Sequence, residues 1–200
     1  MGAAVTAKKG AIKSKTYTVA GDTVEAILTD LEKKQIGGTD AVGDCSTAVK
    51  VPAIKKFDEK ENEKFKGKDK VEWIVTAKSG EVEMEGTITL PVLKSDKELS
   101  DKGKKEWNRF LSSLTAHEDL HVAAAWSVTE DIAKELSEMK GTGQGKDKDA
   151  AIKAAEADFV KQYNAAYTGD KVAKRVTKAH KELDAKGNTF TLDANVEDEK

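Results

Sequence analysis

The sequence predicts an α+β fold in which a small antiparallel sheet packs on one long helix, backed by carboxy-terminal helices. Two patterns carry this prediction. Apolar and polar residues alternate across residues 71–90, which is typical of strands with one face in water. Between residues 95 and 139 the apolar residues recur every three or four positions, which is typical of an amphipathic helix.

The amino-terminal part of the chain predicts a strand and then a helix. Residues 16–19 (Thr-Tyr-Thr-Val) have strand character. Residues 22–25 (Asp-Thr-Val-Glu) then combine a capping residue with an acid three positions later, and apolar residues continue at helical spacing to Leu31. We expect this helix to end near Gly37-Gly38.

The middle of the chain predicts further strands. Residues 43–57 contain β-branched residues and a proline, which favour an irregular or edge strand. The charged run 58–70 offers little to bury and predicts a solvated loop. Residues 71–77 and 82–90 then alternate around a turn that ends at Gly80, so they predict an antiparallel hairpin.

Helices dominate the remainder. The long helix of residues 95–139 should end before the glycine-rich stretch Gly141–Gly145, which we interpret as a flexible connector. Further helices are expected at 149–167 and 170–184, and residues 189–192 have strand character.

Composition narrows the class of protein. Of the 200 residues, 38% are hydrophobic and 35% charged, which suits a polar single domain with a core of about 16–192 and tails at 1–14 and 193–200. Thirty-four basic and 36 acidic residues give a net charge of −2, which removes the electrostatic case for nucleic-acid binding. The apolar runs are too short to insert into a membrane, since a spanning helix needs about 20 residues. The first residues lack the apolar segment of a signal peptide, and a single cysteine excludes an internal disulfide.

The motif H-E-x-x-H occupies residues 117–121, within the long predicted helix. His117 and His121 lie four positions apart, so on a helix their Cβ atoms are about 5–6 Å apart and both rings can reach one ion. Glu118 follows the first histidine, where its carboxylate can deprotonate a water molecule held by zinc. The helical stripe places the motif toward the interior. We therefore expect a zinc site with Glu118 as the general base, against the alternative of two histidines that merely pack in a core.

Catalytic zinc usually has three protein ligands and a water molecule, so one ligand is missing from the motif. His180 is the remaining histidine of the chain and lies on the apolar stripe of the last predicted helix, where a structural role is the alternative. Glu156 is its main competitor, and Asp184 comes next. We take His180 as the expected third ligand and leave the other two open.

Other chemistries have weaker support. Cys45 is a possible nucleophile, but its setting resembles an ordinary strand. Residues 141–146 differ from a phosphate-binding loop because no strand precedes them and Lys146 is followed by aspartate.

Three stretches resemble a bacterial family of predicted secreted zinc-dependent proteases, long catalogued as a domain of unknown function. They are residues 17–23 (Tyr-Thr-Val-Ala-Gly-Asp-Thr), 86–91 (Gly-Thr-Ile-Thr-Leu-Pro) and 107–121, where a tryptophan and spaced leucines precede H-E-x-x-H. The resemblance covers about residues 16–190, and the last stretch is the specific one.

The resemblance implies a zincin-like fold in which His117 and His121 bind zinc and Glu118 is the general base. It also implies export from a bacterial cell, to the periplasm or the medium. Members of the family often close with Tyr-Asp-x-x-Thr-x-His-Gly. The comparable residues 183–190 contain no histidine, which puts the third ligand in question.

These observations together predict a monomeric zinc metallopeptidase that acts on a peptide or protein. Zn²⁺ is the expected cofactor, and we expect an extended substrate to pair with an edge strand of the sheet. A non-catalytic metal-binding or protein-interaction module that retains the same scaffold is the main alternative. A zinc hydrolase acting on a non-protein amide is a further one.

Overall fold

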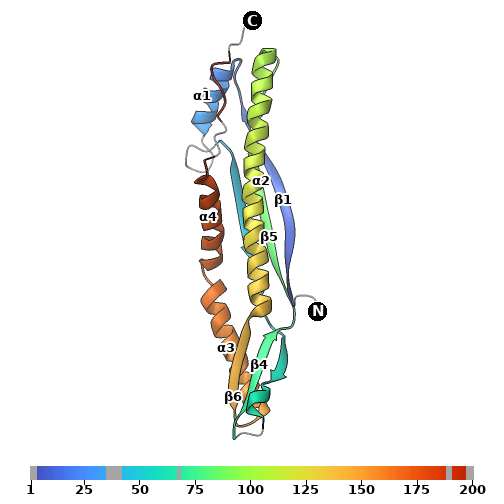
Figure 1. Ribbon diagram of the computed structural model, residues 1–200. Helices are drawn as coiled ribbons and strands as arrows, with labels where there is room; N and C mark the ends of the chain where they lie inside the picture. Colours follow the sequence, from blue (N-terminus) through green and yellow to red (C-terminus); the bar gives the residue numbers. More distant parts are fainter. Residues whose placement is uncertain (1–3, 35–41, 67–68, 188–190, 197–200) are drawn as a thin grey trace. The chain divides into compact units, whose positions relative to one another are not determined.

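A computed structural model shows that the protein is an α+β protein (Figure 1). The structure describes residues 4–34, 42–66, 69–187 and 191–196. Its strands are β1 (Val5–Val19), β2 (Asp44–Lys50), β3 (Phe57–Glu61), β4 (Val71–Ala77), β5 (Gly80–Leu93) and β6 (Lys140–Gly145). Its helices are α1 (Val24–Lys34), α2 (Asp101–Glu138), α3 (Lys148–Tyr167) and α4 (Lys171–Asp184), with a short 3₁₀-helix η1 (Glu63–Phe65). The predicted α+β class is confirmed, with two small sheets among the described residues where the sequence predicted one.

The chain forms two compact units. Unit 1 comprises the described residues of Met1–Gly10, Ala48–Met84 and Ala125–Lys178. Unit 2 comprises those of Ala11–Thr47, Glu85–Ala124 and Ala179–Lys200. Three-stranded sheets of order β1-β5-β2 and β3-β4-β6 are present. The single domain expected from the sequence stays a prediction, although β1 begins at Val5, well inside the expected tail.

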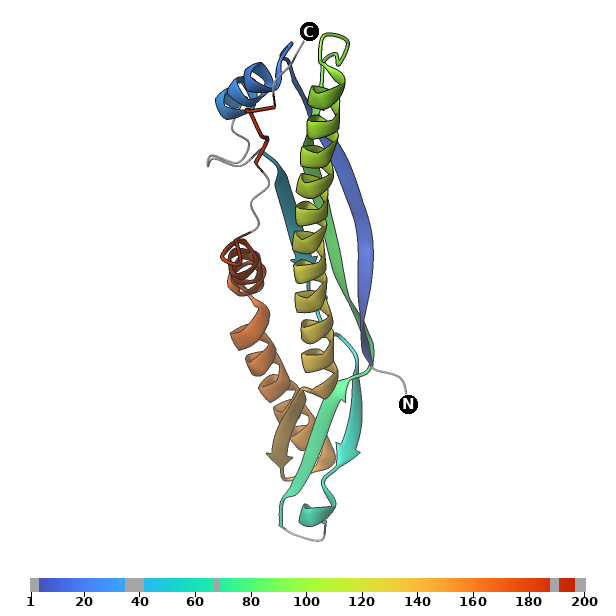
Figure 2. The same ribbon diagram turned by 45° about the horizontal axis from the view of Figure 1, so that its top comes forward.

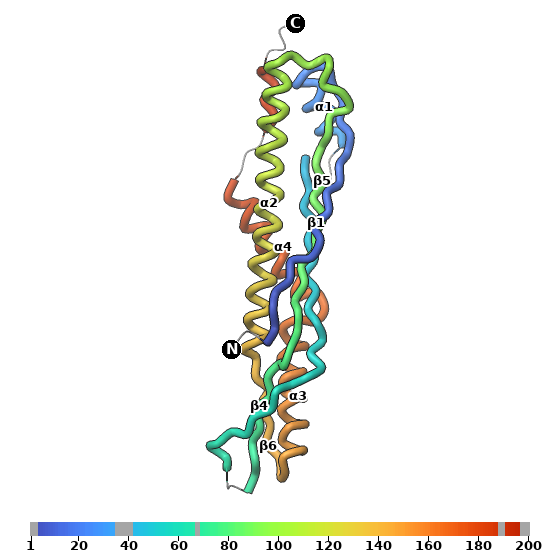
Figure 3. Tube along the Cα trace, turned by 90° about the vertical axis from the view of Figure 1, so that its right-hand side faces the viewer, coloured from blue at the N-terminus to red at the C-terminus, as the bar shows by residue number. Residues whose placement is uncertain are grey.

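In unit 1, the antiparallel sheet β3-β4-β6 packs against α3 (Figures 2 and 3). The contact is close because β6 has glycine at alternate positions. A methyl group on Gly141 or Gly143 would collide with backbone atoms of Ala155 in α3. Glycine in this strand therefore permits a helix to lie directly against the backbone of the sheet.

The core of unit 1 joins this sheet to the second half of α2. Val75 of β4, Ile132 of α2 and Phe159 of α3 are all essentially buried. The ring of Phe57 packs edge-on against Phe159, with 5.0 Å between the ring centroids.

In unit 2, the first half of α2 lies alongside β1 and β5 (Figure 3). Ile27 and Leu31 of α1 pack in one buried cluster with Trp107, Phe110 and Leu114 of α2. This cluster occupies the turns of α2 that precede the H-E-x-x-H motif, and it therefore anchors the helix that carries the candidate site.

The predicted helices agree with the structure. Thr23 caps α1, because its hydroxyl oxygen accepts a 3.1 Å hydrogen bond from the Ala26 N–H. Ser100 caps α2 in the same way through the Gly103 N–H at 3.0 Å, so α2 begins several residues later than expected. The expected end of the first helix, at Gly37-Gly38, lies outside the described residues.

Strand pairing differs from the prediction. The predicted hairpin of residues 71–77 and 82–90 is wrong, since β4 belongs to the sheet β3-β4-β6 and β5 to the sheet β1-β5-β2. After β4, the Lys78 N–H donates to the Lys56 carbonyl at 3.0 Å, and at the start of β5 the Gly80 N–H donates to the Ala4 carbonyl at 3.2 Å. The alternation identifies each strand, but partners distant in sequence decide which strand it pairs with.

Three other predicted segments also differ from the structure: two that were expected to be irregular and one that was expected to be a strand. The expected solvated loop at 58–70 contains most of β3 and the helix η1. The expected connector Gly141–Gly145 is almost all of β6, which pairs with β4. The expected strand at 189–192 falls partly outside the described residues, and residues 191–192 are not in a strand.

Candidate metal centre

The H-E-x-x-H motif lies in a continuous stretch of α2. His117, Glu118 and His121 are 8%, 4% and 7% exposed, so the prediction that the motif faces the interior is confirmed. All the residues of the candidate site described next belong to unit 2.

Three side chains converge on one point. The Nε2 atoms of His117 and His121 are 3.0 Å apart. Asp184, the last residue of α4, places Oδ1 at 3.1 Å from His121 Nε2 and 3.5 Å from His117 Nε2. The two imidazoles are buried, whereas the Asp184 side chain is 55% exposed, so the group is open to solvent on the aspartate side.

The spacing of these atoms fits a tetrahedral metal ion. Ligands that bind zinc at about 2.0–2.1 Å in a tetrahedron lie about 3.3–3.4 Å from one another. The three observed separations of 3.0, 3.1 and 3.5 Å bracket that value. Two imidazole nitrogens and one carboxylate oxygen also form the ligand set of several catalytic zinc sites.

His180 lies next to this group without pointing its Nε2 atom into it. That atom is 3.2 Å from the Thr47 hydroxyl oxygen, and the ring centroid is 4.8 Å from that of His121. The structure thus brings Asp184 to the third position and gives His180 a different partner. The prediction that His180 is a ligand stays a prediction. Glu156, the other competitor, lies on α3 in unit 1.

Two histidines at the site, His121 and His180, have a pKa below the usual value because they are buried. Burial lowers the pKa of His121, an effect that nearby His180 and His117 reinforce and Asp184 opposes. Burial likewise lowers the pKa of His180. A lower pKa favours the neutral imidazole, which is the form that binds a metal ion.

Glu118 is the buried carboxylate that the sequence predicts as the general base. Burial, reinforced by the carboxylates of Asp44 and Asp184, raises its pKa to about 7. A divalent cation close by would lower this pKa again, because a positive charge favours the carboxylate. Glu118 would then be ionised at neutral pH and able to accept a proton.

Cys45 is unsuited to nucleophilic attack. Burial, with the negative charges of Glu118, Asp44 and Asp119, raises the pKa of its thiol to about 12. The thiolate is the reactive form, so this environment suppresses it at neutral pH.

Strand β2 contributes neighbours that the sequence did not single out. Asp44 acts electrostatically on Glu118, and Thr47 bonds to His180. Gly43, just before β2, lies against Glu118. No motif marks these residues, because they approach α2 only through the fold.

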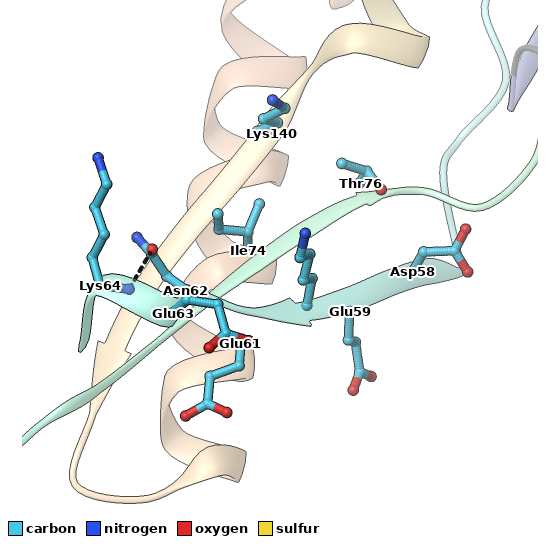
Figure 4. A pocket seen from close by; sticks show the side chains of 10 residues that line it. Asp58, Glu59, Glu61, Asn62, Glu63, Lys64, Ile74, Thr76 and Lys140 are labelled. Atoms are coloured by element: carbon cyan, nitrogen blue, oxygen red, sulfur yellow. Dashed lines mark hydrogen bonds between the residues drawn. The ribbon is translucent and has the colours of Figure 1, made fainter. Parts of the chain in front are cut away.

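A hollow of about 530 Å³ on the sheet of unit 1 is a weaker candidate (Figure 4). Carboxylates and lysines both line it, among them Asp58 and Glu61 of β3 and Lys140 of β6. Charges of both signs line this exposed sheet surface, so it lacks the converging ligands that distinguish the group in unit 2.

Comparison with known families and structures gives one match. Residues 14–191 match the family model described as "Bacterial protein of unknown function (DUF922)", and the chain belongs to this family. Neither the curated proteins nor the solved structures include a match. Across the described part of the chain, no helix combines the length and apolarity required to span a membrane.

Proposed function

We propose that this member of the bacterial family is a zinc-dependent metallopeptidase, with its metal centre at His117, His121 and Asp184. The observation that carries the proposal is the convergence of three ligand atoms, 3.0 to 3.5 Å apart, beside the buried carboxylate of Glu118. Kinship with zincin-like peptidases and export from the cell, both implied by the resemblance, are parts of the same proposal.

Bound zinc would polarise the scissile carbonyl and make a water molecule more acidic. Glu118 takes a proton from the attacking water and later transfers it to the departing amine, so that one carboxylate serves both steps. Asp184 lies on α4 and the two histidines lie on α2, and helices hold a site more precisely than loops do.

Strand β2 supports a peptide as the substrate. It is the last strand in the order β1-β5-β2, and its first half carries Asp44 and Thr47 close to Glu118 and His180. An extended peptide that pairs with this strand by backbone hydrogen bonds would lie beside the general base.

The test combines metal analysis with hydrolysis. Protein purified without chelators should contain one zinc per chain, and His117→Ala should lose it. Glu118→Gln should retain zinc and lower the hydrolysis of a mixed peptide library by about 10²–10⁴-fold, the usual contribution of a general base. Zinc-free wild-type protein would reject the metal centre, and full activity of Glu118→Gln would reject the role of Glu118.

A non-catalytic zinc protein is the second candidate, and the position of His180 favours it. Its ring centroid lies 4.8 Å from that of His121, so a rotation of the side chain could supply a fourth protein ligand. Closed sites with four protein ligands are structural. X-ray absorption spectroscopy of the zinc protein separates the two, since a peptidase requires three protein ligands and a water molecule.

A further inference from the structure

We propose that Gly43 is a positioning residue, which sets the place of the Glu118 carboxylate by leaving room for it. The inference rests on the proposed peptidase function for its catalytic consequence. The contact itself is a property of the fold and can be tested separately.

Gly43 is buried and lies against the side chain of Glu118. A methyl group on Gly43 would be 2.6 Å from Glu118 Oε1 and 2.8 Å from Leu114 Cδ1. Ordinary contacts between such atoms begin at about 3.4–3.5 Å. Any residue larger than glycine therefore competes with the carboxylate for the same space.

The backbone does not require glycine at this position. Among the glycines in the described ranges, only Gly169 and Gly187 have positive φ. The torsion angles of Gly43 are thus open to other residues, and the demand for glycine comes from space alone. Alanine at this position would add one methyl group without backbone strain.

Glu118 is the partner that would yield. Leu114 is fully buried in the cluster with Trp107 and Phe110, where close packing resists movement. The Glu118 carboxylate ends a flexible side chain and can rotate away. The collision would displace it by about 1 Å, and a misplacement of that size can lower turnover by about 100-fold.

The experiment compares Gly43→Ala with Gly10→Ala. Gly10 is a matched control in β1 of unit 1, where a methyl group would be 2.9 Å from Met84 O and 3.0 Å from Glu83 Oε1. We expect Gly43→Ala to retain wild-type zinc content and KM, and to lower kcat for the mixed peptide library by about 100-fold. Gly10→Ala should keep the wild-type kcat. An unchanged kcat in Gly43→Ala, or a loss of its zinc, would overturn the positioning role.

A second measurement needs no catalysis. Gly43→Ala should lower Tm of the zinc-free protein in the wild-type background, and lower it less in a Glu118→Ala background, where the carboxylate is absent. Equal losses in the two backgrounds would show that Gly43 does not act on Glu118. If the wild-type zinc protein hydrolyses no peptide, the proposed function fails. The comparison of Tm in the wild-type and Glu118→Ala backgrounds still tests whether Gly43 acts on Glu118.

Discussion

Replacement of Asp184 by alanine tests which side chain completes the metal centre. Asp184 Oδ1 lies 3.1 and 3.5 Å from the two histidine nitrogens, whereas His180 Nε2 is directed to Thr47. Asp184→Ala should therefore weaken zinc binding strongly, and His180→Ala should weaken it little.

The expected magnitude follows from the number of ligands. Zinc sites with four protein ligands bind with about 10–16 kcal/mol, so one ligand contributes roughly 2.5–4 kcal/mol. At about 1.4 kcal/mol per tenfold change, the loss of Asp184 should weaken zinc binding by about 60- to 700-fold. If His180 is a neighbour outside the ligand set, its loss should cost about tenfold, the lower end of the effect of residues that surround a metal site.

Competition with a chromogenic chelator at fixed pH measures both affinities. Circular dichroism of the zinc-free variants serves as the control for folding. Asp184 is more than half exposed at the end of α4, so its truncation should leave the helix content unchanged. A larger loss of affinity in His180→Ala than in Asp184→Ala would refute the assignment and restore His180 as the third ligand.

Two further predictions concern stability. Glu106 is buried and accepts hydrogen bonds of 2.7 and 2.6 Å from Arg109, which lower the pKa of its carboxyl. The ionised carboxylate therefore contributes to the free energy of unfolding above pH 4.3, which is about the pKa of glutamate in the unfolded chain. This contribution is lost as the pH falls through the lower pKa of the folded state. Glu106→Gln should lower the free energy of unfolding by about 1–3 kcal/mol at pH 7, and this difference from wild type should vanish in strong acid. Urea titrations that give the same difference at both pH values would contradict the prediction. Gly143→Ala places a methyl group against the Ala155 backbone and should lower the free energy of unfolding by about 3 kcal/mol or more in the same assay. Gln144→Ala, on the exposed part of β6, should lower it little. Equal losses in the two variants would contradict the packing of α3 on β6.

The helices and the motif were predictable because their information is local. Every third or fourth residue of α2 is apolar, and this period places Glu118 and both motif histidines toward the interior. The same period located α3 and α4 to within a few residues.

The strand partners were not predictable from local alternation. β4 has the pattern of a half-buried strand, yet its neighbours come from residues 57–61 and 140–145. Glycine-rich β6 has no strand pattern in its own sequence. It is a strand because it pairs with β4, and α3 packs against it where glycines leave no side chain in the way.

By itself, then, the sequence determined the class of the fold, its helices, and the pair of histidines with an acid between them. Only the tertiary structure showed that the Asp184 carboxylate is the side chain of α4 that lies beside both histidine nitrogens. His180 and Asp184 are four residues apart on α4 and therefore share a face, so helical periodicity cannot choose between them. The choice depends on which turn of α4 lies beside the motif on α2. Contacts between elements that are remote in the chain set this position.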